Sequence, residues 1–183
     1  MKKLLLTVVA MMAVSFAQAQ TLKDEVLAIV ESSGLLEKLL GDQPKASGED
    51  AVDSYQNAVV SVAGLAVDNS KKILDLFNKF ESGTTDLEFL IADANNLKES
   101  IQKEGSDFKD AQTKATAAAK RVADLGNEVA TASPLTKLKA LKKLKSSTSV
   151  LNFTKDCSTT LAKETLTQSA VVVKLISAIT GKE

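Results

Sequence analysis

The sequence predicts an all-α protein: an elongated antiparallel bundle of four to six helices with coiled-coil-like seams, preceded by a cleaved signal peptide. Three observations favour this fold class. Apolar residues recur at alternating three- and four-residue steps over two long segments, as in coiled coils. The 183 residues contain only two prolines, Pro44 and Pro134, and both fall outside those apolar seams. No segment alternates apolar and polar residues convincingly enough to predict a strand.

Residues 1–19 have the features of a bacterial signal peptide. Two lysines at positions 2 and 3 precede an apolar run, and Ala17-Gln18-Ala19 supplies the small residues that precede a cleavage site. We therefore expect cleavage after Ala19 and a single mature domain, 20–183, that is periplasmic or secreted. Residue 20 is Gln rather than Cys, so a lipoprotein is not expected. A membrane-spanning first helix is the alternative, but the apolar run is shorter than the roughly 20 residues that spanning requires.

Two helices are predicted in the first half of the mature chain. The first spans about Thr21 to Leu40, and Gly34 would kink or divide it; a loop rich in helix breakers follows at 41–48. The second spans about Asp50 to Phe80 and carries a seam with eight apolar residues in nine positions. The seam consists of Val52, Tyr55, Val59, Val62, Ala66, Asn69, Ile73, Leu76 and Phe80. Asn69 is the exception, and a polar seam residue of this kind sets register.

A second seam runs from Leu87 to Ala132, after a turn in which Thr84 or Thr85 would cap the helix. Thirteen of its fourteen positions are apolar, and the exception, Glu104, precedes Gly105, so the helix either kinks there or breaks and restarts. Ser133 and Pro134 predict the start of the next helix, because serine suits an N-cap and proline the first helical position. That last helical stretch covers 135–180, either continuous or broken near 146–149, and stops at Gly181.

The residues that most enzymes use are missing from this sequence. It has no histidine, which removes the usual nucleophile–base pairs and zinc sites. Cys157 is the only cysteine and cannot form an intramolecular disulfide; we expect a buried small side chain, with pairing to another chain or reactivity as the alternatives. Phosphate-binding loops and EF-hand loops are absent. We therefore expect no catalytic residue, metal or cofactor, and a carboxylate-only glycosidase is the remaining enzymatic alternative.

The charge pattern points to one candidate contact surface. Acidic and basic residues balance at 23 each, and loss of the two signal-peptide lysines leaves the mature chain at −2, which argues against nucleic-acid binding. One tract nevertheless carries five lysines and no acid: Lys137, Lys139, Lys142, Lys143 and Lys145. This tract has three interpretations. It belongs to a bundle helix whose lysines extend to solvent, it contacts an anionic surface or an acidic partner, or it docks onto the acidic stretch 81–110 of the same chain.

The expected function follows from the seams and from the missing catalytic residues. We expect an exported, non-enzymatic helical bundle that acts through protein–protein interaction, with a protein partner or a second copy, by a seam, an end or a face. The alternative is a lipid- or membrane-engaging protein, including the pore-forming type. Its basis is the lysine tract and the apolar run 58–67, which is otherwise expected at the centre of the bundle. Nucleic acid is not an expected partner.

Overall fold

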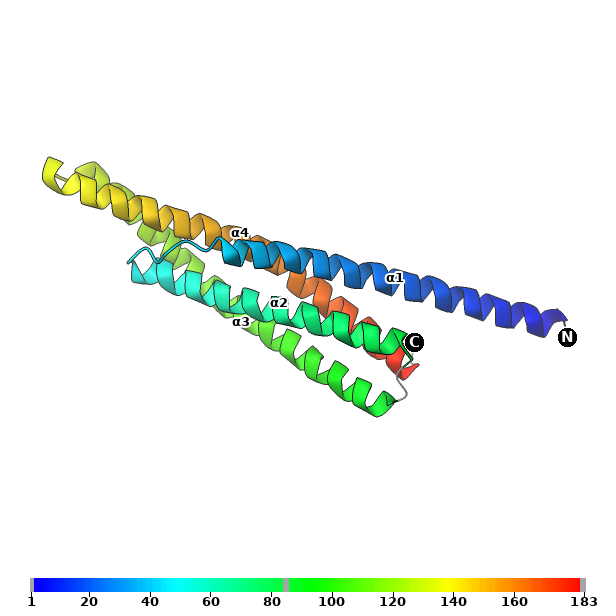
Figure 1. The fold of residues 1–183 in the computed structure, drawn as a ribbon. Coiled ribbons are helices and arrows are strands. Elements are labelled where there is room, and N and C mark those ends of the chain that lie inside the picture. The colour runs from blue at the N-terminus through cyan, green and yellow to red at the C-terminus, as the bar shows by residue number, and fades with distance from the viewer. Residues whose placement is uncertain (1, 84–85, 182–183) are drawn as a thin grey trace.

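The protein folds into four helices that lie along one long axis (Figure 1). The computed structural model describes residues 2–83 and 86–181, and side chains from residue 20 onward within those ranges. The helices are α1 (Lys2–Gly41), α2 (Asp50–Glu81), α3 (Leu87–Thr131) and α4 (Pro134–Thr180), with no strand in the described part of the chain. Successive helices run antiparallel, so the predicted all-α elongated bundle is confirmed.

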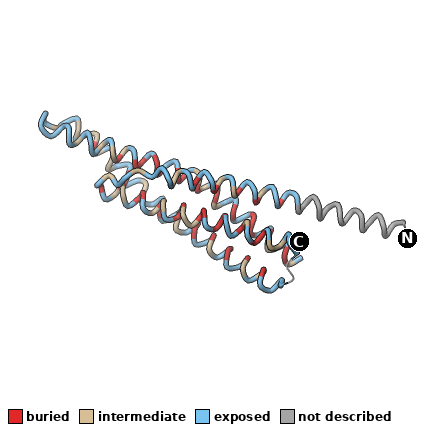
Figure 2. Tube along the Cα trace, viewed as in Figure 1, coloured by how far each residue is buried: buried red, intermediate tan, exposed pale blue. Residues whose placement is uncertain are grey.

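The helices are arranged around a contact between α2 and α4. Helix α1 packs on one side of this pair and α3 packs on the other, so that α1 and α3 do not touch within the described residues. The seam residues of α2 predicted from the sequence are buried, except for the half-buried Phe80. Figure 2 shows buried residues along the inward faces of the helices over most of the bundle's length. The seams of α2 and α3 are therefore largely satisfied within one chain.

Three helices are continuous at points where the sequence leaves a kink or a break open. Helix α1 continues through Gly34, α3 through Gly105, and α4 through 146–149. Each of these points has a packed neighbour: Ser33 beside the exposed Gly34 is buried, Ser147 is fully buried, and a Cβ placed on Gly105 would lie 3.6 Å from Cγ2 of Thr165. Tertiary contacts thus outweigh the low helix propensity of glycine and serine at these positions. The bundle has four helices for this reason, rather than five or six.

The helix ends agree with the sequence in part. Pro134 begins α4 directly after Ser133, as predicted, and Gly181 ends it with φ +62°, a left-handed conformation that favours glycine. Helix α3 begins differently: Asp86 is its N-cap and accepts a hydrogen bond from the Phe89 amide at 3.0 Å. The caps predicted at Thr84 and Thr85 lie outside the described residues.

The apolar run 58–67 lies in the core of the bundle, as its all-round hydrophobicity predicts. Val59, Val62, Ala66 and Val67 of this run are buried against neighbouring helices. Within the residues that the structure describes, none of the helices combines the length and the apolar character needed to cross a membrane. The predicted cleavage point after Ala19 falls inside α1, and the signal peptide stays a prediction.

Candidate functional site

One end of the bundle consists of α3 and α4 alone. Figure 1 shows that the hairpin formed by these two helices projects beyond the loop that joins α1 to α2. We call residues 122–142, which surround the turn at Ser133, the hairpin tip. Leu125 is buried there and Val129 and Ala140 are half-buried, which indicates that the two helices still pack against each other along the tip.

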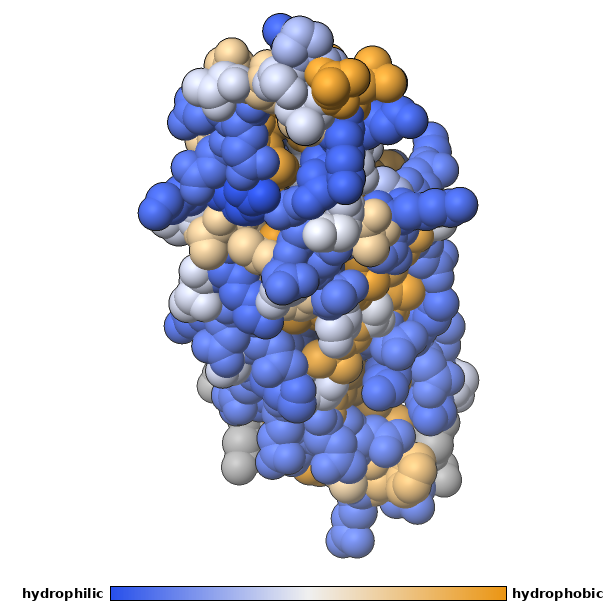
Figure 3. All heavy atoms as spheres, turned by 90° about the vertical axis from the view of Figure 1, so that its left-hand side faces the viewer, coloured by the Kyte–Doolittle hydropathy of each residue, from blue (hydrophilic) through white to orange (hydrophobic). Residues whose placement is uncertain are grey.

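Three leucines of the hairpin tip are exposed. Leu135 is 95% exposed, Leu138 67% and Leu141 43%. They step around α4 at three-residue intervals, and no third helix lies beyond them to cover them. In Figure 3, which faces this end of the molecule, hydrophobic side chains gather at the top among hydrophilic ones. Exposed apolar groups clustered in this way mark an interaction surface more often than leucines scattered singly.

The predicted lysine tract lies on and directly behind the hairpin tip. All five of its lysines are exposed, and Lys143 alone is in an ion pair, with Glu49 at 2.7 Å. The other four, Lys137, Lys139, Lys142 and Lys145, form no ion pair within the described part of the chain. The tract does not dock onto the acidic stretch 81–110, so that interpretation is wrong. Because α3 and α4 run antiparallel, 81–110 faces the far end of α4.

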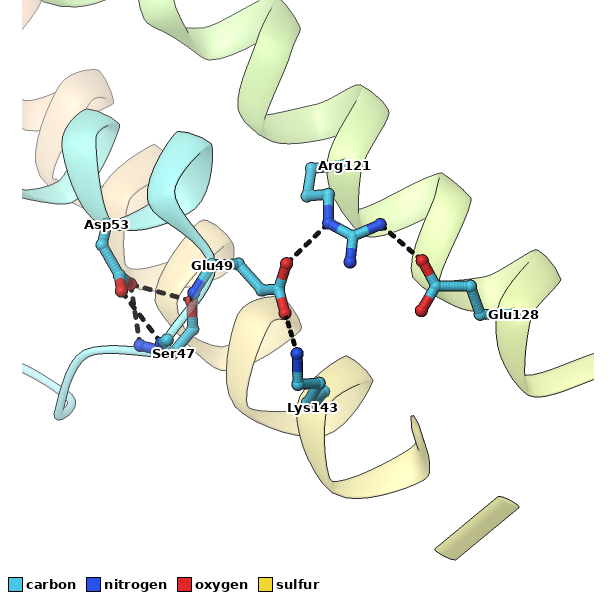
Figure 4. Close-up of polar contacts among 7 residues, drawn as sticks. Ser47, Glu49, Asp53, Arg121, Glu128 and Lys143 are labelled. Atoms are coloured by element: carbon cyan, nitrogen blue, oxygen red, sulfur yellow. Dashed lines mark hydrogen bonds and ion pairs between the residues drawn. The ribbon is translucent and has the colours of Figure 1, made fainter. Parts of the chain in front are cut away.

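A cluster of charged residues fixes the root of the hairpin tip (Figure 4). Glu49, at the end of the α1–α2 loop, accepts from Arg121 Nε at 2.6 Å and from Lys143 Nζ at 2.7 Å. Arg121 also donates to Glu128 at 2.6 Å. Hydrogen bonds from Arg121 and then from Lys143 lower the pKa of the Glu49 carboxyl. We call Glu49, Arg121 and Lys143 the root clamp, because they join the loop, α3 and α4.

The loop that carries Glu49 is itself held in shape by Asp53. This carboxylate accepts from the Ser47 amide at 2.7 Å, the Ser47 hydroxyl at 2.8 Å and the Gly48 amide at 2.9 Å (Figure 4). Three hydrogen bonds to one carboxylate set the path of the chain into α2. Glu49 is thereby presented to Arg121 and Lys143, and the sequence reasoning missed this role because the three residues of the clamp lie far apart in the chain.

A polar layer crosses the middle of the apolar core. Asn69 of α2, a predicted seam residue, is fully buried and donates to Glu104 of α3 at 2.8 Å. Thr165 of α4 donates to the other oxygen of Glu104 at 2.5 Å, and Ser100 donates to Asn69 Oδ1 at 2.7 Å. Burial raises the pKa of the Glu104 carboxyl, against the two hydrogen bonds, which lower it. The register-setting role of Asn69 stays a prediction, and these contacts supply its physical basis.

The second half of the polar layer is centred on Glu164 of α4, which is 1% exposed. Its Oε1 accepts from Ser70 at 2.7 Å and from Gln168 at 3.1 Å, while its Oε2 has no hydrogen-bond partner among the described residues. Two carboxylates thus lie in one layer, the general composition of an acid–base pair. Both are sealed from solvent by the surrounding helices. The break in the α3 seam at Glu104 was the available signal for this layer, whereas α4 gave none that singled out Glu164.

Two further places that could carry chemistry are a buried cysteine and a surface pocket. Cys157 is fully buried as expected, and burial together with the nearby Asp156 raises its pKa to about 11. No group of three acidic, histidine or cysteine side chains in the described ranges could hold a metal ion. A surface pocket between α2 and α3 has a volume of about 280 Å³, and two of its lining residues, Asp75 and Asp93, already pair with Lys79.

Comparison of the chain with protein-family models, with curated proteins and with solved structures finds no match. The function is therefore inferred from the hairpin tip, the root clamp and the polar layer.

Proposed function

We propose that this chain is an exported, non-enzymatic helical-bundle protein that acts by docking, and that the hairpin tip is its docking surface. The observation that carries the proposal is the exposure of Leu135, Leu138 and Leu141 at an end that α1 and α2 do not reach. Of the seam, end or face considered from the sequence, the end is favoured because the seams of α2 and α3 are occupied by the chain's own helices.

The chemistry of the buried residues supports a non-enzymatic role. Catalysis by a pair of carboxylates needs access to a substrate, and Glu104 and Glu164 are 0% and 1% exposed. A cysteine nucleophile needs a lowered pKa, whereas that of Cys157 is raised to about 11. The charged residues that are best connected, those of the root clamp, tie a loop to two helices.

The proposed function is tested by retention on bacterial envelope fragments, which contain both membrane lipid and membrane protein. The exported protein is purified from the expressing bacterium, and mass spectrometry of its N-terminus checks cleavage after Ala19. We expect the wild-type protein to sediment with the fragments and the double variant Leu135→Ser, Leu138→Ser to stay in solution.

The matched control is Leu27→Ser, Leu35→Ser on α1, where both leucines are about half exposed. This variant is expected to sediment like the wild-type protein. Equal retention of all three proteins, or retention of none, would show that the hairpin tip is not a docking surface. Circular dichroism of each variant verifies that the fold is intact.

A further inference from the structure

We propose that the hairpin tip docks on an anionic lipid surface, with the exposed leucines at the boundary between headgroups and acyl chains and the unpaired lysines at the lipid phosphates. This inference rests on the proposed function, because it names the partner of the same surface. It selects the lipid alternative over a protein partner on the basis of charge, shape and depth.

The charge of the hairpin tip is complementary to an anionic surface. No acidic residue occurs from Val129 to Lys155, and the six lysines in this segment include the four tract lysines that have no ion-pair partner among the described residues. Lysines near an anionic membrane are attracted individually, and their contributions accumulate. An intramolecular acid has neutralised only Lys143, at the root, so the positive charge towards the turn is available to an external partner.

The shape of the hairpin tip suits shallow insertion. Leu135 lies one residue into α4, and Leu141 lies six residues further, which is about 9 Å along the helix axis. Helices that bind at membrane interfaces bury their apolar side chains by roughly 5–10 Å. Because the tip projects from the bundle, it can reach that depth without any change in the packing of the four helices. The lysines interspersed with the leucines have long stems that bring their ammonium groups back to the headgroups.

A second copy of the chain fits the hairpin tip less well. A two-fold contact between tips would bring the unpaired lysines of both copies together, and like charges at an interface oppose association. A protein partner would need an acidic surface with apolar pockets spaced for three leucines. A fluid anionic bilayer meets both requirements without a specific shape.

The test is binding of the exported protein to protein-free vesicles of phosphatidylcholine, with and without phosphatidylglycerol. We expect the wild-type protein to bind the anionic vesicles at least about tenfold more tightly than the neutral ones at about 0.05 M salt, and to lose this preference at about 1 M. The variant Lys137→Gln, Lys139→Gln, Lys142→Gln, Lys145→Gln is expected to bind the anionic vesicles at least about tenfold more weakly than wild type. The variant Leu135→Ser, Leu138→Ser is expected to lose binding as well.

The matched control removes the same charge elsewhere: Lys98→Gln, Lys109→Gln, Lys114→Gln, Lys163→Gln. These four lysines are exposed and form no ion pair among the described residues. This control is expected to bind within about twofold of wild type, since attraction at an anionic surface falls off within a Debye length. An equal loss in both quadruple variants would overturn the inference, because binding would then depend on overall charge.

Three further outcomes separate this inference from the proposed function. Tip-dependent retention on envelope fragments without binding to anionic vesicles would overturn the lipid inference and leave a docking tip with a protein partner. Light scattering that detects a dimer lost in the leucine variant would likewise overturn it in favour of a second copy. Absence of tip dependence in both assays would reject the docking function itself.

Discussion

Glu104 is an ionisable residue whose chemistry is altered by the fold. Its carboxyl is fully buried, and both oxygens accept hydrogen bonds, from Asn69 and from Thr165. Burial raises its pKa, which means that the folded protein favours the neutral acid relative to the unfolded chain. The charged form therefore reduces stability, and this reduction is relieved as pH falls through the folded-state pKa towards the unfolded value.

Replacing Glu104 with Gln tests this argument. Gln accepts from Asn69 through its oxygen and donates one amide hydrogen to Thr165, whose hydroxyl then donates to the Leu161 carbonyl. We expect the free energy of unfolding at pH 7 to rise by about 1 kcal/mol, because a buried charge is removed and its hydrogen bonds are kept. The advantage over wild type should shrink as pH is lowered towards 4.5. Urea unfolding at several pH values measures it, and an advantage that grows on acidification would contradict the raised pKa.

The continuity of α3 at Gly105 leads to a prediction at the scale of the helix. A Cβ at this position would make an ordinary 3.6 Å contact with Thr165, and glycine in a helix interior costs roughly 0.5–1 kcal/mol relative to alanine. Gly105→Ala is therefore expected to increase the free energy of unfolding by about that amount. Gly181→Ala provides the contrast and should destabilise, because φ there is +62°. Thermal unfolding compares the two, and a less stable Gly105→Ala protein would indicate a strained α3 at this point.

The root clamp predicts how the helices respond to acid. Glu49 has a lowered pKa, so its contribution to stability is present above the unfolded-state value near 4.5 and is lost as pH falls through the folded-state pKa. We expect Glu49→Gln to be less stable than wild type at pH 7, and the difference to disappear in strong acid. High salt should also reduce the difference, since Arg121 and Lys143 are partly exposed. Chemical unfolding across pH and salt measures both trends; a difference independent of pH would rule out an ionic role.

Whole helices follow from the sequence more directly than the contacts between them. Periodicity predicted α2 almost to the residue, and Ser133-Pro134 predicted the α3–α4 turn, because these signals are local. At Gly34, Gly105 and 146–149 the sequence left a break open, because contacts from distant helices decide whether a weak helix segment breaks. The Glu104 and Glu164 contacts, like the Glu49 clamp, could not be foreseen, because each joins residues on different helices. The lysine tract was visible in the sequence. Which of its lysines form an ion pair depends on the position of Glu49, the residue directly before α2.

At the scale of the whole molecule, the hairpin tip has fewer buried apolar contacts than the rest of the bundle. The three apolar clusters that form its core include no residue between 123 and 149, so the hairpin tip lies outside them apart from Val122, which packs against one cluster. Local opening is easiest where few buried apolar contacts hold the backbone. We expect amide hydrogens of the hairpin tip to exchange faster with deuterium than those in the middle of α2, by about tenfold or more. Uniform protection along α3 and α4 would show that the tip is as stable as the core.

The root clamp also has a mechanical consequence. It acts as a fulcrum, with a lever arm of about 12 Å from Lys143 to Leu135 at the rise of an α-helix. A sideways load on the leucines passes along α3 and α4 into the body of the bundle, and the clamp passes part of it through Glu49 into the α1–α2 loop. Salt screens the partly exposed ion pairs of the clamp. We therefore expect the hairpin tip to bend more easily at high ionic strength, while the apolar core keeps its rigidity.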